Sequence, residues 1–381
     1  MTGLNIVWIA CTEAYPHKFS ANNTKVELLS SGLKDLGCNI SIVNKYYGSH
    51  QKCNYSFEYC GFNIYTFKTL RNKVVTSFVN LFRISKLLPR IKINEENNLA
   101  IITCSSLMHN LLLIMALKFY GYKIALLFQE WYPAQKVPLV NKINGWLHSY
   151  LIGYFVDYIL PISEFIIKKT EHFNKPSFKL PICAKFNDNC EVLPLSNEFV
   201  YCASAGYKDA ALFVLDAFKD FCVSKKGYSL CMILSGTVKE LEDIQSEINI
   251  RSLTSSVSVM SKLPYDILLA KYKTALALLI PQDPTSISEI ARFSQKIAEY
   301  LSVGRPVISN SVGEINHYFT DKENMFIAHD HSIKTYSSLM KYVVENPNMA
   351  TLIGRNGFTY GKQHFDYLVL SKGLNYFFRN N

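Results

Sequence analysis

The sequence lacks the features that would place it in a specialised class of protein. Its 13 prolines and 17 glycines form no tract among 381 residues, and no segment is of low complexity, which excludes collagen-like and linker-dominated chains. No short repeat recurs, which disfavours solenoids and propellers. The start of the chain lacks a basic stretch and a small-residue cleavage site, so we predict no signal peptide. The longest apolar tracts, 110–128 and 149–167, are interrupted by charges and are predicted to be buried helix–strand pairs.

The ten cysteines contain no C-x2-C pair and no Cys/His cluster with zinc-ligand spacing. Without an export signal we expect them to be reduced and packed as small apolar residues. We therefore predict a cytoplasmic protein, either free or peripheral on the inner face of the cytoplasmic membrane. No metal is expected.

Acidic residues are scarce in one half of the chain. Of the net charge of +10, residues 1–195 carry +9, and 59–94 contain no acid at all. Basic side chains there, including Arg83, Lys86 and Arg90, alternate with apolar ones. Such a segment suits an anionic membrane surface or a polyanionic partner. The alternative is a solvated helix face over a core.

Strand-like and helix-like segments alternate along the chain. Asn5–Ala10 is a short apolar run, and Thr24–Leu36 has apolar residues at helical spacing before Gly37. The pattern restarts with an apolar run at Phe199–Ser204, after a linker-like stretch. This predicts an α/β protein of two Rossmann-like, doubly wound domains facing a cleft.

Three parts follow from that restart. Residues 1–195 would form the acceptor domain and 196–360 the donor domain. Residues 361–381 would form a helix that packs back on the N-terminal domain.

The stretch 293–308, FSQKIAEYLSVGRPVI, carries the clearest chemical signal. Ser294 is positioned to cap a helix whose free N–H groups would bind a diphosphate. Glu299, more than one turn further on, could accept both hydroxyl groups of a ribose. The alternative is an ordinary helix–turn–strand unit of any α/β protein.

This string resembles the signature of the GT-B retaining glycosyltransferases, which include bacterial capsule, O-antigen and lipid-glycan transferases. The resemblance covers about 155–345 and is weak before that. It implies that Glu299 holds the donor ribose and that Lys208 lies near the diphosphate, with Lys296 a weaker candidate that could point to solvent. The backbone of Phe293, Ser294 and Gln295 would touch phosphate. The donor would be a UDP- or GDP-linked sugar, with no cofactor and no metal.

Two departures from that family pattern affect the phosphate site. Ala291 occupies the position of the first Glu of the usual Glu-x7-Glu pair, with Glu289 two residues out of register. Ala203–Ser204 replace an expected Gly–Arg, and Arg292 could supply the missing cation. Nearby, Gly313 and Glu314 open another helix and could contact the donor.

The N-terminal half offers fewer candidates. In the loop expected after the first strand, Asn22 and Asn23 replace glycines and could hydrogen-bond a sugar, and His17 could act in catalysis unless it is an exposed loop residue. After a later strand, Glu130 could be an acceptor base or sugar ligand. Trp131, with the neighbouring Tyr132, could stack on a sugar or lipid, or could instead anchor the loop by packing.

The sequence thus predicts transfer of a sugar from a nucleoside diphosphate to a glycan or lipid-linked acceptor. The setting would be bacterial surface polysaccharide synthesis, with retention at the anomeric carbon and no nucleic-acid partner. Two alternatives stay open. One is a GT-B sugar-nucleotide epimerase, and the other is a non-catalytic subunit that binds a partner or membrane.

Overall fold

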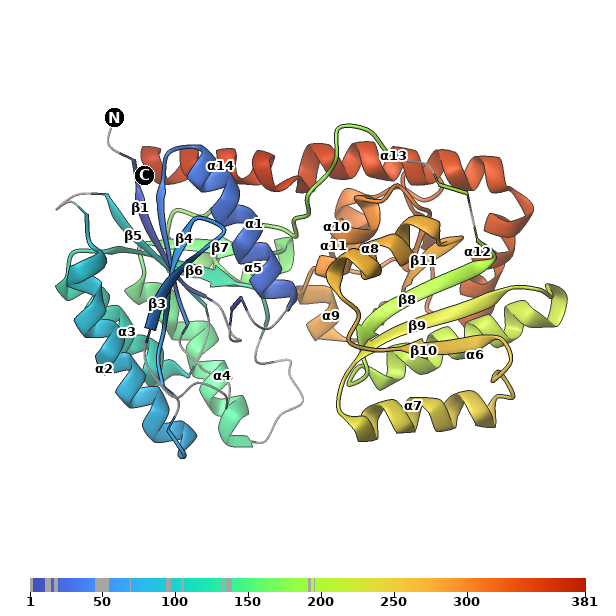
Figure 1. The fold of residues 1–381 in the computed structure, drawn as a ribbon, viewed down its shortest axis with the longest axis horizontal. Coiled ribbons are helices and arrows are strands. Elements are labelled where there is room, and N and C mark those ends of the chain that lie inside the picture. The colour runs from blue at the N-terminus through green and yellow to red at the C-terminus, as the bar shows by residue number, and fades with distance from the viewer. Residues whose placement is uncertain are drawn as a thin grey trace. The chain divides into compact units, whose positions relative to one another are not determined.

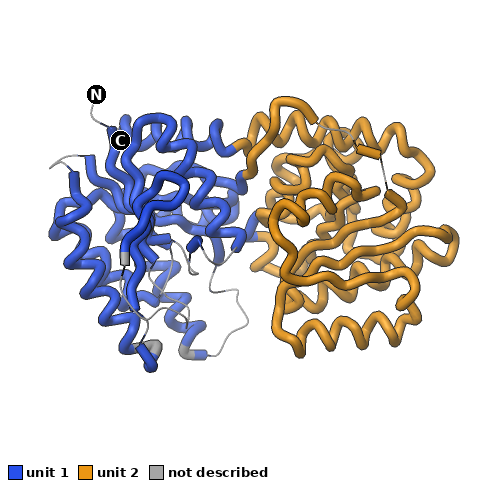
Figure 2. The backbone as a smooth tube through the Cα atoms, in the orientation of Figure 1, with its two compact units in different colours: residues 1–183, 291–293, 367–381 blue, residues 184–290, 294–366 orange. Residues whose placement is uncertain are grey.

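The chain folds into two compact units, which the computed structural model describes over most of their length. The first unit comprises 1–183, 291–293 and 367–381, and the second comprises 184–290 and 294–366 (Figure 2). The described residues are 3–10, 15–16, 20–44, 55–68, 70–93, 97–103, 106–131, 133, 139–190, 193–194 and 196–381.

A seven-stranded sheet forms the centre of the first unit, in the order β3-β4-β2-β1-β5-β6-β7. Its strands are β1 (Asn5–Ile9), β2 (Asn39–Val43), β3 (Tyr55–Tyr59), β4 (Phe62–Thr66), β5 (Asn98–Thr103), β6 (Lys123–Phe128) and β7 (Tyr158–Pro161). All neighbours pair in parallel except the β3–β4 hairpin at one edge, which the sequence analysis did not predict. Every residue of β1 and β5 is buried, as expected for parallel strands covered on both faces.

Helices cover both faces of this sheet (Figure 1). They are α1 (Ala21–Asp35), α2 (Lys73–Ile91), α3 (Leu107–Phe119), α4 (Leu139–Leu151), α5 (Glu164–Thr170) and α14 (Tyr367–Asn380). Right-handed crossovers place α2, α3 and α4 on one face, because each leads to a strand on the same side of its predecessor. The crossover through α1 runs in the opposite direction, so α1 covers the other face.

The C-terminal helix α14 packs on α1 within the first unit (Figure 1). The two helices approach closely, because Ser371 Oγ donates to the carbonyl oxygen of Leu29 at 3.2 Å. A side chain at Gly32 would collide with Ser371. Leu370, Leu374 and Phe378 join the core of this unit. The last helix of the chain thus belongs to the first unit, while the sequence placed the domain boundary at 195/196 and the units divide at 183/184.

The second unit has a six-stranded, fully parallel sheet in the order β10-β9-β8-β11-β12-β13. Its strands are β8 (Glu198–Ser204), β9 (Ser229–Ser235), β10 (Val257–Met260), β11 (Ala277–Ile280), β12 (Val307–Asn310) and β13 (Phe326–Ala328). Its helices are α6 (Lys208–Ser224), α7 (Val238–Ile250), α8 (Tyr265–Thr274), α9 (Ile287–Ala291, whose last residue belongs to the first unit), α10 (Gln295–Leu301), α11 (Glu314–Tyr318), α12 (Ile333–Glu345) and α13 (Pro347–Phe365).

Local sequence signals explain where many helices begin and end. Thr237 and Glu240 form a reciprocal capping box at the start of α7, and Ser163 Oγ accepts from Ile166 N at the start of α5. Gly37 follows α1 with φ of 82°, a conformation that favours glycine. Among the described residues, no helix is both long and apolar enough to cross a membrane.

Candidate functional site

The second sheet changes direction between β8 and β11. The chain runs from β8 outward through β9 and β10, then returns to the other side of β8 and continues through β11, β12 and β13. In open α/β sheets, ligands bind outside the carboxyl ends of the strands at such a switch point. Here those ends carry Ser204 on β8 and the segment after Ile280 on β11, which defines the candidate donor site of this unit.

Glu299 lies on α10, between β11 and β12. Its side chain is only 4% exposed, and its Oε2 accepts from Lys296 Nζ at 2.7 Å. No other described side chain hydrogen-bonds the carboxylate, so Oε1 is available to a ligand. Lys296 is itself three-quarters buried, and its side chain is turned toward this carboxylate. The sequence alternative of a solvent-directed Lys296 is therefore wrong.

The protonation state of Lys296 depends on both burial and the neighbouring carboxylate of Glu299. Burial alone would lower the pKa of Lys296, because it penalises the charged form, but the adjacent carboxylate of Glu299 outweighs it and the pKa is raised. The Lys296 ammonium group therefore stays charged at neutral pH. It neutralises a carboxylate that would otherwise be costly to bury.

Two tyrosines, Tyr300 and Tyr272, connect α10 to its surroundings. The Tyr300 hydroxyl accepts from the backbone N of Cys202 on β8 at 3.0 Å, and its ring packs edge-on against Tyr272, with centroids 4.9 Å apart. Burial raises the pKa of Tyr300 well above its ordinary value, so it remains a neutral hydroxyl. These contacts fix the helix that carries Glu299 to the sheet. Tyr300 lies within the string 293–308, but the sequence analysis missed this structural role, because the partner Cys202 is remote in sequence.

Ser294 precedes α10 in extended conformation but its side chain makes no capping hydrogen bond. Ser294 is thus the N-cap residue of α10, as predicted, although the cap does not involve its side chain. The Ser294 backbone accepts from Ile297 N at 3.0 Å instead, which tightens the first turn. Gln295, the first residue of the helix, is 9% exposed. The helix has only seven residues, which limits its dipole.

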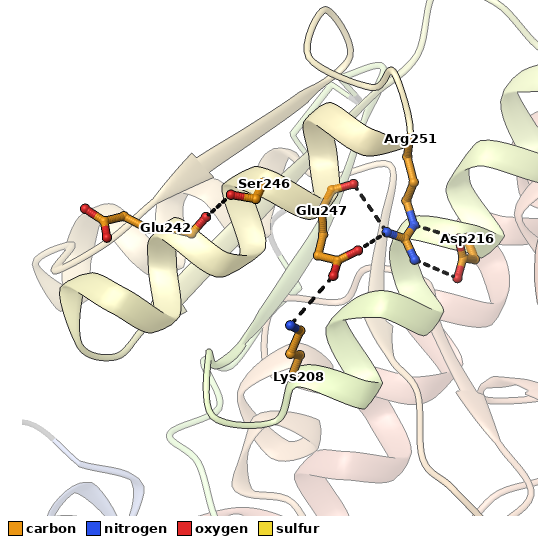
Figure 3. A network of polar contacts seen from close by, with 6 residues as sticks. All are labelled: Lys208, Asp216, Glu242, Ser246, Glu247 and Arg251. Atoms are coloured by element: carbon orange, nitrogen blue, oxygen red, sulfur yellow. Dashed lines mark hydrogen bonds and ion pairs between the residues drawn. The ribbon is translucent and has the colours of Figure 1, made fainter.

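Lys208 begins α6, just after the loop that follows β8. Its ammonium group is 3.6 Å from Glu247 on α7, and Glu247 also binds Arg251 at 2.5 Å (Figure 3). Arg251 in turn makes a two-pronged contact with Asp216 on α6. Because Lys208 is about half exposed, its contact with Glu247 is weak and exchangeable. Ser204 Oγ accepts from Gly206 N at 3.3 Å and so shapes the loop before α6.

The segment after β12 opens α11. Gly313 has φ of 51°, and a Cβ there would lie 2.7 Å from the carbonyl oxygen of Ile290. Only glycine fits this position, because the backbone at Gly313 lies directly against the backbone of Ile290 on α9. Glu314, the first residue of α11, is buried.

Gln282, just after β11, was missed by the sequence analysis. It is 4% exposed, and its Oε1 has no hydrogen-bond partner among the described residues. The backbone N of Gln282 donates to Asn310 Oδ1 at 3.1 Å, which ties the end of β11 to the end of β12. A buried, unsatisfied amide at a switch point is suited to a polar ligand. No sequence motif announces it, because its burial arises from strands that are distant along the chain.

Three residues of the signature region belong to the first unit, namely Ala291, Arg292 and Phe293. Ser163 Oγ donates to the carbonyl oxygen of Ala291 at 2.5 Å, and Phe293 is buried. The nearby Glu289 accepts from Asp283 N at 2.8 Å, so its carboxylate stabilises the loop after β11. The predicted donor residues are thus divided between the units.

On the first unit, Asn22 and Asn23 lie in the first turn of α1. The prediction that they lie in a loop is wrong, because the helix begins at Ala21, capped by Ser20. Asn22 Nδ2 donates to the carbonyl oxygen of Ala10 at 2.7 Å, which ties the helix to the end of β1. His17 lies outside the described residues.

The segment after β6 holds the remaining candidates. Glu130 is exposed, whereas Trp131 is 5% exposed and packs against Phe128, Tyr150 and Phe165. Trp131 therefore anchors its loop, which was the packing alternative for this residue. Tyr132 lies outside the described residues. Lys86 and Arg90 are exposed on α2, and Arg83, half-buried, donates to the carbonyl oxygen of Lys68 at 3.0 Å.

Comparison with known proteins identifies the chemistry of the second unit. Residues 195–359 match the family model described as glycosyl transferases group 1. The chain carries a group 1 glycosyltransferase domain, and it is a glycosyltransferase. The match covers somewhat less than half of the chain and includes α10 and the switch point. No curated protein sequence matches.

Solved structures extend the likeness to the whole chain. A sucrose-phosphate synthase from Thermosynechococcus elongatus is 11% identical, with 99% of this chain and 98% of that chain covered and a TM-score of 0.77. A glycosyltransferase from Rickettsia africae is 12% identical, covers 100% and 99%, and has a TM-score of 0.70. HepE of Anabaena, solved with UDP-glucose, is 10% identical, covers 99% and 100%, and has a TM-score of 0.72. Identities this low show the fold alone, which is GT-B as predicted.

Proposed function

We propose that this glycosyltransferase moves a sugar from a nucleoside-diphosphate sugar to a glycan or lipid-linked acceptor. The observation that supports it most is Glu299, a carboxylate that is almost fully buried yet has one oxygen that accepts no hydrogen bond from the described residues. A ligand hydroxyl group that donates to this second oxygen would add a charged hydrogen bond at a site largely shielded from water.

Ribose is the ligand that suits this carboxylate. Vicinal hydroxyl groups donate two hydrogen bonds that a carboxylate accepts, and hydrogen bonds to a charged acceptor are stronger than those between neutral groups. The family resemblance of the signature assigns the same role to Glu299. The solved relative HepE of Anabaena was crystallised with UDP-glucose, which favours a nucleotide sugar here too.

The diphosphate would lie against basic groups and backbone N–H groups. Lys208 is the foremost side-chain candidate, since its weak contact with Glu247 can be exchanged for phosphate. The backbone of Phe293, Ser294 and Gln295, with Arg292, would supply further contacts, and Gly313 and Glu314 would meet the donor from α11. No metal is required in this scheme, because cations of the chain would offset the charge on the leaving group. That metal-free mechanism stays a prediction.

The acceptor side is assigned to the first unit, with His17 and Glu130 as candidates for proton transfer. We propose bacterial surface polysaccharide synthesis as the setting and retention as the stereochemical outcome, both on the family resemblance of 293–308. Three basic residues of α2, Arg83, Lys86 and Arg90, would meet a lipid-linked acceptor at a peripheral membrane site on the cytoplasmic side.

A thermal-shift screen against UDP- and GDP-sugars tests the donor proposal. A ligand at 100 times its dissociation constant should raise the free energy of unfolding by about 2.7 kcal/mol. The matching activity is slow release of UDP or GDP, measured without acceptor. Both should be lost in Glu299→Ala and kept in Glu323→Ala, a matched control at an exposed glutamate of the same unit. Failure of every common donor to bind would overturn the proposal.

A further inference from the structure

Three neighbouring helices of the first unit expose apolar side chains in stripes. On α2, α3 and α4 the exposed residues recur at intervals of three, four or seven, so each set lies along one side of its helix. The exposed apolar residues are Val75, Phe78 and Phe82 on α2, Met108, Met115 and Phe119 on α3, and Leu139, Ile143 and Trp146 on α4. Phe119 is 82% exposed.

Polar contacts hold these helices together as one layer. Ser77 Oγ and His109 Nδ1 lie 2.9 Å apart and join α2 to α3. Asn144 Oδ1 accepts from Leu107 N at 3.0 Å and joins α3 to α4. Asn110 Nδ2 and His148 Nε2, 3.0 Å apart, make a second α3–α4 contact, which is buried. The three stripes therefore lie on one connected layer, on the sheet face opposite α1 (Figure 1).

The charged side chains of these three helices have one sign. None of the three helices contains an aspartate or glutamate. Basic residues accompany the apolar stripes, namely Arg83, Lys86, Arg90 and Lys142, together with Lys118, whose ammonium group lies 3.9 Å from the Asp157 carboxylate. Lys86 Nζ lies 4.4 Å from the centroid of the Phe82 ring, so a cation sits directly beside an exposed aromatic side chain.

We propose that this three-helix face docks on an anionic lipid bilayer and inserts its apolar side chains among the lipids. Apolar side chains provide insertion, and flanking lysines and arginines meet acidic headgroups. Trp146 is the kind of residue that favours the boundary between acyl chains and headgroups. A second copy of this chain would fit poorly, because a two-fold contact would bring cations against cations.

This inference extends beyond the basic residues of α2 that the proposed function invokes. It adds α3 and α4, and it assigns most of the binding to inserted apolar side chains rather than to charge alone. It rests on the proposed function only for the presence of a lipid-linked acceptor. Vesicle binding is measured without nucleotide or acceptor. A failure of the docking proposal can therefore be distinguished from a failure of the donor proposal.

Co-sedimentation tests the docking face directly. Full-length protein is mixed with vesicles of phosphatidylcholine alone or of phosphatidylcholine with phosphatidylglycerol. Binding should require phosphatidylglycerol, and Phe82→Asp and Trp146→Asp should each weaken it about tenfold, the loss expected when one large side chain no longer inserts. Lys86→Glu with Arg90→Glu should also weaken binding. Val223→Asp on α6, at an apolar residue of the second unit that is more exposed than Phe82 or Trp146, should leave it unchanged.

Tryptophan fluorescence provides a second readout of insertion. The chain has three tryptophans, of which Trp8 and Trp131 are buried and Trp146 is 51% exposed. Quenching by acrylamide therefore reports mainly on Trp146. Anionic vesicles should shield it and shift its emission to shorter wavelength, and Trp146→Phe should abolish both changes.

Several outcomes would overturn the proposal. They are equal binding to both kinds of vesicle, full binding by the Phe82→Asp/Trp146→Asp double variant, and unchanged quenching of Trp146 in the presence of vesicles. Self-association in gel filtration that is lost in Phe82→Asp, without vesicle binding, would assign the face to a second copy instead. Circular dichroism melting of each variant excludes loss of fold as the cause.

Discussion

Lys296 Nζ and Glu299 Oε2 lie 2.7 Å apart on neighbouring turns of α10. The pair occupies one oxygen of the carboxylate and leaves the other for a ligand. It also holds the carboxylate in one rotamer, since both side chains are largely buried. In the proposed donor site, Lys296 is therefore a positioning residue for Glu299 rather than a phosphate ligand.

Replacing Lys296 should weaken donor binding indirectly. In Lys296→Met, the Glu299 carboxylate loses its partner, and we expect KM for the donor to rise about tenfold or more, because breaking a buried pair leaves a costly charge. Lys296→Arg should recover much of the loss. Steady-state kinetics at varied donor concentration would measure the KM of both variants. An unchanged KM in Lys296→Met, with a normal melting temperature, would contradict the positioning role.

Lys208 should matter for the donor and little for stability. Its contact with Glu247 is long and half exposed, so Lys208→Met should change the free energy of unfolding by less than about 1 kcal/mol. If Lys208 binds the diphosphate, kcat/KM should fall about tenfold or more, as for the loss of a charged hydrogen bond. Denaturant unfolding and kinetics on the same variant separate the effects. A normal kcat/KM would show that Lys208 does not bind the diphosphate and only contacts Glu247.

Gly313 should not tolerate a side chain. Gly313→Ala combines a positive φ with a Cβ 2.7 Å from the carbonyl oxygen of Ile290, and we expect a loss of about 2 kcal/mol or more in the free energy of unfolding. Gly227→Ala is the matched control, because Gly227 has φ of 84° but open space around it. It should cost about 1 kcal/mol. Urea titration measures the free energy of unfolding of both variants. Equal losses would show that the contact between the new Cβ and the carbonyl oxygen of Ile290 contributes nothing.

Lys25 should make the stability of the first unit depend on pH. It is buried on α1, its Nζ donates to the carbonyl oxygen of Leu180 at 2.9 Å, and burial lowers its pKa from 10.5 to about 8. Between these two values the unfolded chain binds more protons, so this lysine makes stability rise with pH from 8 to 10.5. Below pH 8 the buried Lys25 is charged, and burying that charge lowers the free energy of unfolding by about 3 kcal/mol.

Comparison of the wild type with Lys25→Met isolates this contribution, because other groups titrate equally in both. The stability difference between the two proteins should be constant below pH 8 and change progressively as pH rises to 10.5. Urea unfolding at a series of pH values measures it. A difference that does not vary with pH would show that Lys25 titrates normally.

The GT-B fold was predictable from the sequence because local patterns agree with the tertiary structure. Apolar runs became buried parallel strands, and the run predicted at Phe199–Ser204 is β8 (Glu198–Ser204). The β3–β4 hairpin was missed, since its strands lie at the sheet edge and lack a continuous apolar run. The first turn of α1 was also missed, because Asn22 and Asn23 resemble loop residues until Ser20 is seen to cap them.

By itself, the sequence determined the alternation of strands and helices and the restart of that pattern in the second half, and it singled out Glu299 as a candidate ligand-binding residue. These follow from periodicity and from neighbours close along the chain. Only the tertiary structure decided that Lys296 pairs with Glu299, that Gln282 is buried without a partner for its oxygen, and that the apolar stripes of α2, α3 and α4 lie on one layer. Those features arise where distant segments meet, and burial there sets which polar groups are satisfied and which apolar ones remain exposed.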